Sequence, residues 1–361
     1  METMTRADLA YIGRNLIPFD KNAEKAVLSR WDNIAKPIEG LGIYEKIVAR
    51  IGGIRKTDSP VIDNRSLVLF FSDNGIVQSG VSQSDVEVTH KVAKATAAGK
   101  STACLMAQKA GINIIPIDIG MKGDIVTGLV NHRISEGTES FLKSCAMSEE
   151  QVLKAIEVGY NIAMQLKKEG CDLVLLGEMG VANTTTSTAV ACALLGKDPT
   201  QFTGHGSGLS EEALKHKAGV IRDGIEKHGF ASALSDPFEV LRSLGGYDIA
   251  AMVGVFLGSG CSGIPVVLDG VVSLAAALVA QKLFPGITDV MIASHRPREP
   301  IARQILDELG LSAPMDADLA LGEGTGAILL VPQIDICLEL YRNGLSFDGL
   351  GMDSYRRYDS L

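Results

Sequence analysis

The sequence predicts an α/β protein with a mostly parallel, doubly wound (Rossmann-like) sheet, helices on both faces, and a small helical subdomain formed by the two chain ends. Two observations support this prediction. Short apolar runs alternate with longer stretches of helical character, and hydrophobic residues make up 46% of the chain whereas aromatic residues make up 5%. A core of Ala, Val, Ile and Leu suits helices that cover a buried parallel sheet. Strands that alternate with helices also require βαβ crossovers.

Five runs of strand length are expected to form the sheet. Each is β-rich or continuously apolar and is bounded by Gly, Asp, Ser or Pro. They span residues 66–72, 111–118, 172–176, 264–268 and 289–293. In such a sheet, ligands bind beyond the carboxyl ends of the strands, so the segments after these runs are candidates for the site.

Helical segments with start signals lie between the strands. Ser148-Glu-Glu-Gln151 is a capping box ahead of a periodic stretch that reaches Lys168, and Gly170 is a stop signal. Asp236-Pro237 places a proline in a first helical turn. These helices supply the crossovers that a parallel sheet needs.

Both ends of the chain are also expected to be helical. The first 60 residues contain no convincing strand and surround the turn 36–42, and residues 325–343 have helical character. We therefore predict a helical subdomain from residues 1–60 and 327–361, packed against an α/β catalytic domain of residues 61–326.

Charge and cysteine content exclude several classes of protein. The formal net charge is -9 and no run of Lys or Arg forms a basic stripe, which argues against a nucleic-acid or anionic-membrane surface. The six cysteines include no C-x-x-C pair and do not cluster with histidine, so neither a metal site nor a disulfide framework is expected. A cytoplasmic location is the simplest expectation.

No membrane segment is expected either. The first residues have a charge pattern unlike that of a signal peptide. The apolar stretch 266–280 is interrupted by Asp269, Gly270 and Ser273.

Three glycine-rich segments, each containing an acidic residue, are the candidates for chemistry: 70–82, 176–186 and 321–326. In the second, Gly180 allows close backbone approach, while Asn183, Thr184 and Thr185 could offer amides and hydroxyls to a phosphate or ribose. The alternative is ordinary helix capping by Asn183 and the threonines. The segment is neither a P-loop nor a G-x-G-x-x-G fingerprint.

Glu323 stands between two glycines with apolar residues on both sides. Desolvation would raise the pKa of such a carboxyl group and make it a better base near neutral pH. The alternative is a glutamate that favours the dipole of the following helix. Lys217 follows the glycine-rich loop 203–209, where a solvated surface charge is the alternative, and His295 could be structural.

Taken together, these segments resemble the nicotinate-nucleotide:dimethylbenzimidazole phosphoribosyltransferase family. The resemblance extends from about residue 18 to 340. The matching motifs occur in family order: Lys36-Pro37 with Leu41-Gly42, Ser72-Asp-Asn-Gly75 with Gly80-Val-Ser82 and Glu87-Val-Thr89, Gly177-Glu-Met-Gly180 with Asn183-Thr-Thr185, Thr203 to Leu209, Ile264 to Gly270, Ser294-His295 with Glu299-Pro300, and Leu321 to Ala327.

The resemblance implies transfer of 5-phosphoribosyl from nicotinate mononucleotide to an aromatic lower-ligand base of a cobamide, with inversion at C1. The nicotinate ring is cationic at its glycosidic nitrogen and leaves as a neutral pyridine, so no metal and no cofactor is required. Glu323 aligns with the catalytic base, which removes a proton from the acceptor. Glu178 is assigned to positioning the ribose or acceptor.

The resemblance also implies a set of substrate-binding residues. Gly180, Asn183, Thr184 and Thr185 align with the nucleotide cradle, Lys217 with a phosphate contact and Ser294 with another site residue. The other expected substrate-binding positions are Asp73, Asn74, Gly75, Ser82, Val86, Met179, Gly204, Ser207, Gly208, Leu321 and Gly322.

Two departures from the family pattern leave alternatives open. Ala182 stands where relatives commonly have glycine, and Asp85-Val86-Glu87 replaces the Pro and the Gln or His of benzimidazole-using relatives. The acceptor could be dimethylbenzimidazole, another benzimidazole, a purine, or a phenol such as p-cresol, and the assembly a homodimer or a heteromer with a paralogous subunit. A nucleotide hydrolase and a catalytically reduced paralogue are the alternative functions.

Overall fold

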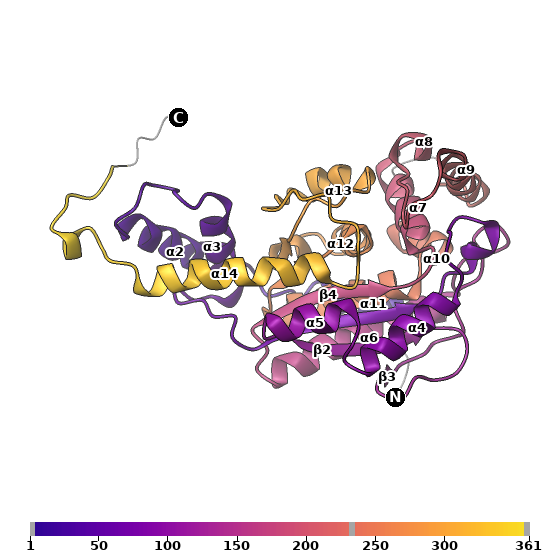
Figure 1. Ribbon diagram of the computed structural model, residues 1–361, viewed down its shortest axis with the longest axis horizontal. Coiled ribbons are helices and arrows are strands. Elements are labelled where there is room, and N and C mark those ends of the chain that lie inside the picture. Colours follow the sequence, from indigo (N-terminus) through magenta and orange to yellow (C-terminus); the bar gives the residue numbers. More distant parts are fainter. Residues whose placement is uncertain (1–3, 231–234, 357–361) are drawn as a thin grey trace.

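The computed structural model describes residues 4–230 and 235–356. The outermost residues of the predicted helical subdomain, 1–3 and 357–361, lie outside the described residues. Six parallel strands form one sheet in the order β3-β2-β1-β4-β5-β6 (Figure 1). The α/β fold with a parallel, doubly wound sheet is therefore confirmed.

The strands agree with the predicted runs at the centre of the sheet and differ at its edges. β1 (Arg65–Ser72), β2 (Asn113–Gly120) and β4 (Leu173–Met179) match closely. β5 (Val266–Leu268) and β6 (Met291–Ala293) are shorter than predicted, since a 3-10 helix (Ile287–Val290) takes the start of the last run. The sequence did not indicate β3 (Val130–Asn131), whose two residues are exposed and carry no apolar pattern.

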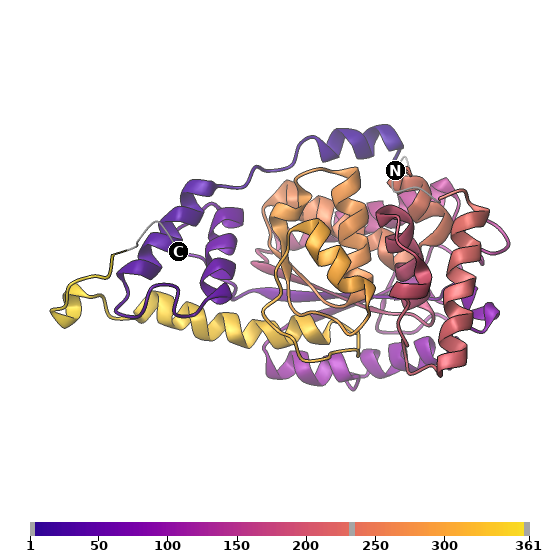
Figure 2. The same cartoon turned by 90° about the horizontal axis from the view of Figure 1, so that it is seen from above.

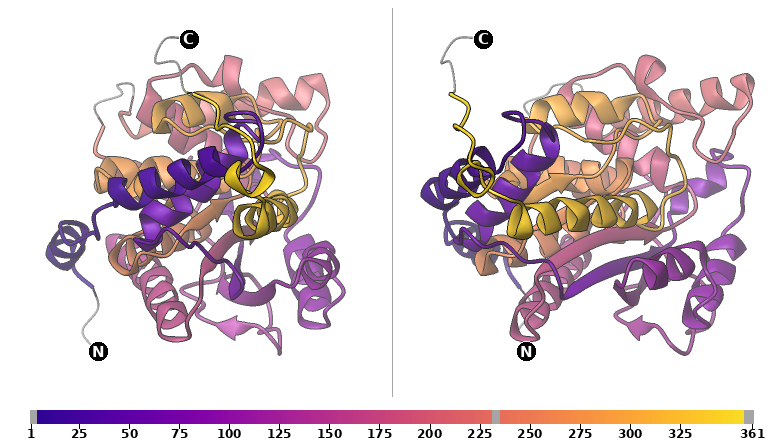
Figure 3. Two further views of the ribbon diagram at one scale, coloured as in Figure 1. Left: turned by 90° about the vertical axis from the view of Figure 1, so that its left-hand side faces the viewer. Right: turned by 60° about the vertical axis from the view of Figure 1, so that its left-hand side comes forward.

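Alternating side chains of the central strands pack into two different cores. Val68 and Phe70 of β1 belong to the core shared with the helices of one face, while Leu67, Leu69 and Phe71 point into the other. The first core includes residues of α6 (Glu149–Lys168), α7 (Asn183–Leu195), α9 (Glu211–Lys227), α10 (Pro237–Leu244), α11 (Tyr247–Ser262), α12 (Val271–Leu283) and α13 (Ile301–Leu309). The second includes α2 (Lys21–Asn33), α3 (Ile43–Arg55), α5 (Thr102–Lys109) and α14 (Thr325–Asn343) (Figure 3). Burial on both faces explains why the strands read as continuous apolar runs.

The predicted helix signals are confirmed. Ser148 accepts from the Gln151 N–H at 3.1 Å while the Gln151 side chain accepts from the Ser148 N–H at 2.8 Å. Asp236 caps the helix that begins at Pro237, and α14 has the predicted bounds. The apolar stretch 266–280 is strand β5 followed by the buried helix α12. Within the described residues, none of the helices has the length and apolar character needed to cross a membrane.

The chain ends pack in two places. Helices α2, α3 and α14 contribute to the second core, together with strand residues (Figure 2). The first helix, α1 (Arg6–Gly13), instead contacts α11, and Ile17 N–H donates to the Gly260 carbonyl at 2.9 Å. The division of the chain into two domains at residues 60 and 326 stays a prediction.

Candidate active site

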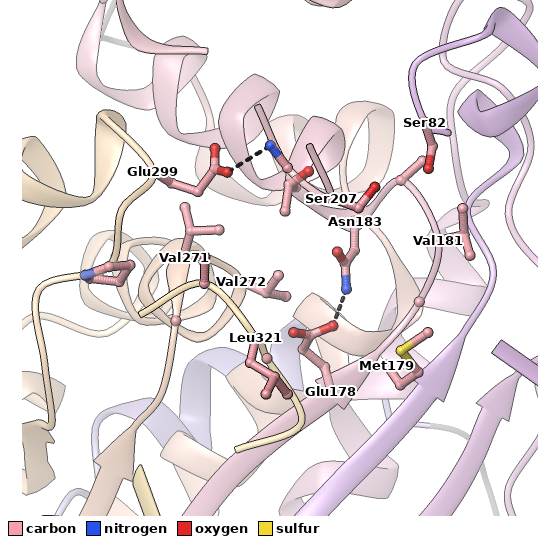
Figure 4. Close-up of a pocket in the computed structure, with 18 of the residues that line it drawn as sticks. Ser82, Glu178, Met179, Val181, Asn183, Ser207, Val271, Val272, Glu299 and Leu321 are labelled. Atoms are coloured by element: carbon pink, nitrogen blue, oxygen red, sulfur yellow. Dashed lines mark hydrogen bonds between the residues drawn. The ribbon is translucent and has the colours of Figure 1, made fainter. Parts of the chain in front are cut away.

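A deep pocket opens at the carboxyl edge of the sheet, where β1, β4, β5 and β6 end (Figure 4). Its empty space of about 1060 Å³ is partly open to solvent. The pocket lies next to β1 and β4, where the order of the strands reverses, which is the expected place for a ligand in a doubly wound sheet.

The turn after β4 is shaped by contact with the end of β1. A Cβ atom at Gly180 would collide with the Ser72 carbonyl oxygen. Asn74 Nδ2 also donates to the Val181 carbonyl at 3.3 Å, which joins the two loops. Glycine is required at position 180 because of a close backbone contact, as predicted, but the Ser72 carbonyl makes that contact.

Ala182 adopts a left-handed backbone conformation with φ 69°. This conformation favours glycine, because a side chain strains it. We expect Ala182→Gly to raise the free energy of unfolding by about 1 kcal/mol, because the relief of strain exceeds the added freedom of the unfolded chain. Denaturant unfolding measures the change. Ala189→Gly, within α7 at an unstrained position, is the matched control and should destabilise; a loss of stability in Ala182→Gly would contradict the prediction.

Glu178, at the end of β4, points into the pocket and accepts a hydrogen bond from Asn183 Nδ2 (Figure 4). The alternative of ordinary capping by Asn183 is wrong, because the N-cap of α7 is Ala182 and makes no side-chain hydrogen bond. Desolvation raises the pKa of Glu178 well above its usual range, and repulsion from Asp248, Asp269 and Glu323 adds to this effect. The carboxyl group is therefore stabilised in its neutral form.

Glu323 lies in a turn of three consecutive residues with positive φ: 85° at Gly322, 58° at Glu323 and 79° at Gly324. Its carboxylate accepts from the Ala103 N–H at the start of α5, at 3.3 Å. Burial raises the pKa of Glu323, and the Ala103 N–H partly opposes that rise. The N–H group that binds this carboxylate belongs to α5, while Glu323 also directly precedes Gly324, the N-cap of α14, so the dipole alternative stays a prediction.

The turn that carries Glu323 touches Glu178 and is held by Asp269. The Glu323 N–H donates to the Glu178 carbonyl at 3.1 Å. The Asp269 carboxylate, just beyond β5, accepts from the N–H groups of Gly324, Gly326 and Ala327 at 3.1, 2.8 and 3.3 Å. The two glutamates are thus fixed on adjoining backbone segments at one corner of the pocket.

Lys217 and Thr184 form another corner of the pocket. The Lys217 side chain is fully buried, which rules out the alternative of a solvated surface charge. Its Nζ donates to Thr184 Oγ1 at 2.9 Å and to the Gly204 carbonyl at 3.1 Å. Desolvation lowers the pKa of Lys217. A buried ammonium with neutral partners is suited to receive an anion.

The structure brings about half of the predicted site residues into the pocket wall. Those that line it are Ser82, Glu178, Met179, Gly180, Asn183, Thr184, Ser207, Lys217, Leu321 and Gly322. His295, which could have been structural, is buried and lines the pocket as well. Glu323 stands directly behind the wall, since its neighbours Gly322 and Thr325 line the pocket.

The predicted residues of the first glycine-rich segment lie behind the wall. Asp73 accepts from the Lys122 N–H at 2.8 Å. A Cβ at Gly75 would collide with the Thr138 carbonyl, so this glycine permits backbone packing. Together with Asn74, which binds the Val181 carbonyl, these residues support the wall and make no contact with its open side.

The remaining predicted residues also lie outside the lining, for local reasons. Val86 is the N-cap residue of α4 (Glu87–Ala97), and Thr185 is buried within α7. The carbonyl oxygens of Gly204 and Gly208 accept from Lys217 and Gln83. Ser294 Oγ is hydrogen-bonded to His295 Nδ1 at 2.8 Å.

Sequence reasoning did not assign two acidic residues of the pocket, Asp269 and Glu299. Their positions carried a signal, because Asp269 directly follows a predicted strand and Glu299 follows the Ser-His pair after the last one. Within residues 4–230 and 235–356, no three His, Cys, Asp or Glu side chains are grouped to hold a metal ion.

Comparisons with known proteins agree with this geometry. A family model described as "Phosphoribosyltransferase" matches residues 16–351. A protein of Clostridium acetobutylicum named nicotinate-nucleotide--dimethylbenzimidazole phosphoribosyltransferase is 36% identical over 338 residues, which cover 93% of this chain and 96% of that protein. A protein of the same name from Desulforamulus reducens is 38% identical over 336 residues, covering 92% and 95%.

Solved structures show the same relationship. The crystal structure of CobT from Thermus thermophilus superposes with a TM-score of 0.86 at 31% identity and covers 92% of this chain and 100% of that one. The family match spans most of the sequence and includes the segments that build the pocket. The chain therefore belongs to the nicotinate-nucleotide:dimethylbenzimidazole phosphoribosyltransferase family, whose members are pentosyltransferases.

Proposed function

We propose that the protein transfers the 5-phosphoribosyl group of nicotinate mononucleotide to an aromatic lower-ligand base. The products are an α-ribotide 5'-phosphate, for assembly of the nucleotide loop of a cobamide, and nicotinate. One observation carries the proposal: a single pocket is lined by the buried ammonium of Lys217 and by Glu178, with the adjoining Glu323 directly behind its wall. Family membership names the reaction that such a pocket would serve.

The donor is proposed to bind with its phosphate at Lys217 and Thr184. These two side chains and the N–H groups of the 204–207 loop offer the donors that a phosphate monoester needs. The ribose then extends toward Asn183 and Glu178, which places C1 near the two glutamates. The C1–N bond breaks with its electron pair passing to the pyridine nitrogen, so the ring nitrogen becomes neutral and nicotinate leaves with only its carboxylate charged.

Two carboxyl groups in different environments can take different roles. Burial raises the pKa of Glu178 and so favours its protonated form, and we assign this residue to positioning, with one oxygen bound by Asn183 and the other able to donate a hydrogen bond. The neutral form of Glu323 is less favoured, because the Ala103 N–H stabilises the charged carboxylate. We therefore assign the general base to Glu323, which takes the N–H or O–H proton of the acceptor as that atom attacks C1.

The Glu323 carboxylate has to turn from α5 toward the pocket to reach an acceptor. We propose that rotation about its side-chain torsions brings it there, since Gly322 and Thr325 on either side of it line the pocket. Catalytic hydrogen bonds in enzymes without substrate are commonly misaligned and form only in the complex. Glu178, which already faces the pocket, is the second candidate for the base.

The acceptor is proposed to lie between apolar side chains next to these glutamates. Met179 and Leu321 line this part of the pocket, and Val88 and the hydroxyls of Ser82 and Ser84 line it beyond them. Asp85 and Glu87, which depart from the family pattern, are exposed, and Glu87 pairs with Lys91 at 2.9 Å. These acids therefore do not dictate the acceptor, and dimethylbenzimidazole, another benzimidazole, a purine and a phenol all stay candidates.

The function is tested by incubating the purified protein with nicotinate mononucleotide and each acceptor in turn. We expect nicotinate release that depends on an acceptor, with a matching ribotide detected by mass spectrometry. Preference for dimethylbenzimidazole over phenol and p-cresol would exclude a phenol as the natural acceptor. Free ribose 5-phosphate without acceptor would identify a hydrolase, and turnover only after addition of a paralogous subunit would identify a heteromer.

The assembly is proposed to be a homodimer or a heteromer with a paralogous subunit. Exposed apolar side chains near the end of the described chain support an interface: Ile336 is 71% exposed and Leu345 63%. A reducing cytoplasm is the proposed location. Mass photometry of the purified chain, alone and with a paralogue, would separate the two assemblies.

A further inference from the structure

Glu299, on the segment after β6, reaches into the glycine-rich loop that borders the Lys217 corner. The Gly206 N–H donates to Glu299 Oε1 at 3.0 Å (Figure 4). Oε2 of the same carboxylate is buried and has no hydrogen-bond partner within the described chain. A Cβ at Gly204 would collide with Oε2, so this glycine leaves the room that the carboxylate fills.

The surroundings of this carboxylate are those of an anion site. Gly206 has φ 54°, and a Cβ there would lie 3.1 Å from Thr184 Oγ1 and 3.3 Å from Lys217 Nζ. The Gly206 backbone, the Thr184 hydroxyl and the Lys217 ammonium therefore meet at one point. An ammonium group has three N–H donors, and here two of them bind neutral oxygens. Backbone N–H, hydroxyl and ammonium donors are the set that a phosphate uses.

Glu299 carries a negative charge that interacts with the Lys217 ammonium of this cluster. Its attraction to Lys217 partly offsets the desolvation of the ammonium. A phosphate bound at the same donors would lie against the Glu299 carboxylate, and two anions sharing one N–H repel each other. The carboxylate and a phosphate oxygen therefore compete for the Gly206 N–H.

We propose that Glu299 is a specificity-determining residue of the donor site: its carboxylate occupies the place of a phosphate oxygen on the 204–207 loop and must be displaced by a phosphorylated ligand. The identity of that ligand rests on the proposed function. A phosphate monoester, with about two negative charges, can displace a single carboxylate. A nucleoside without phosphate leaves Glu299 in place. Displacement also weakens the hold on the phosphorylated product, which favours its release.

The proposal is tested by calorimetric titration of wild type and Glu299→Gln with three probes: inorganic phosphate, nicotinate mononucleotide and nicotinate riboside. Glutamine keeps the shape and still accepts from the Gly206 N–H but carries no charge. We expect the variant to bind phosphate and the mononucleotide about tenfold more tightly. The riboside should bind both proteins equally. Equal or weaker phosphate binding by the variant would overturn the proposal. If the Glu299 carboxylate only stabilised the loop, its removal would not strengthen the binding of phosphate.

Two further variants serve as controls for this titration. Glu308→Gln removes one negative charge from α13, outside the pocket, where Glu308 pairs with Lys282 at 3.1 Å; it should not change phosphate affinity. Glu299→Ala serves if the glutamine protein does not fold, and it should also tighten phosphate binding. Tighter phosphate binding without any binding of the mononucleotide would uphold the role of Glu299 and contradict the proposed donor.

Discussion

Replacing Glu323 by glutamine is expected to lower kcat by about 10²-fold or more, with little change in affinity for nicotinate mononucleotide. The amide keeps the shape of the side chain and cannot take a proton from the acceptor. It also keeps an oxygen that can accept from the Ala103 N–H, so the turn at residues 322–324 should stay folded. Initial rates of nicotinate release give kcat, and calorimetric titration gives the affinity for the donor.

Glu339→Gln is the matched control for this variant. Glu339 lies on α14, the helix that follows the Glu323 turn, and is exposed on its surface, where it accepts from Asn343 at 2.8 Å. Its replacement should leave kcat unchanged. If Glu323→Gln formed ribotide at the wild-type rate, Glu323 would not be the base and the assignment of roles would be wrong.

Replacing Glu178 by alanine is also expected to lower kcat by about 10²-fold, because a hydrogen-bond donor at the reacting centre is lost. Glu178→Gln should stay within about tenfold of wild type, because an amide reproduces a neutral carboxyl group: it donates one hydrogen bond and accepts another. The accepting oxygen would still receive the Asn183 Nδ2 donor. Steady-state kinetics of the two variants side by side measure the rescue.

The rescue distinguishes positioning from proton transfer. A base at position 178 would be lost equally in the alanine and glutamine proteins, so two equally inactive variants would contradict a neutral Glu178.

Thermal unfolding provides a second test of the protonation state of Glu178. The pKa of Glu178 is raised in the folded protein, so its contribution to stability is present at low pH and is lost as pH rises through the folded pKa. Glu178→Gln should remove that loss.

Sequence reasoning recovered the elements whose signals are local. The capping box at Ser148, the proline at 237 and the helix from residue 325 depend on neighbouring residues only. The central strands could be predicted equally well, since both of their faces are buried and their sequences are continuously apolar. The edge strands were predicted less well: the two exposed residues of β3 carry no apolar pattern, and β6 begins two residues later than its predicted run.

The site was predicted as a set of segments better than as a set of side chains. The glycine-rich segments after β4 and before α14 do meet at the pocket. The direction of each side chain could not be read, because it depends on contacts between distant residues. Asn183 turns to Glu178 instead of capping its helix, and Glu323 turns to α5, 220 positions earlier in the chain. Glu299 gave the least signal, since its role depends on a loop that is 93 positions away.

The pH dependence of kcat in wild type and Glu178→Gln tests the division of labour between the two glutamates most directly. Activity should rise with pH as Glu323 ionises and fall again as Glu178 loses its proton, both above the ordinary range for glutamate. In Glu178→Gln the falling alkaline limb should disappear while the rising limb stays. Loss of the rising limb in that variant would instead make Glu178 the base and contradict the role assigned to Glu323.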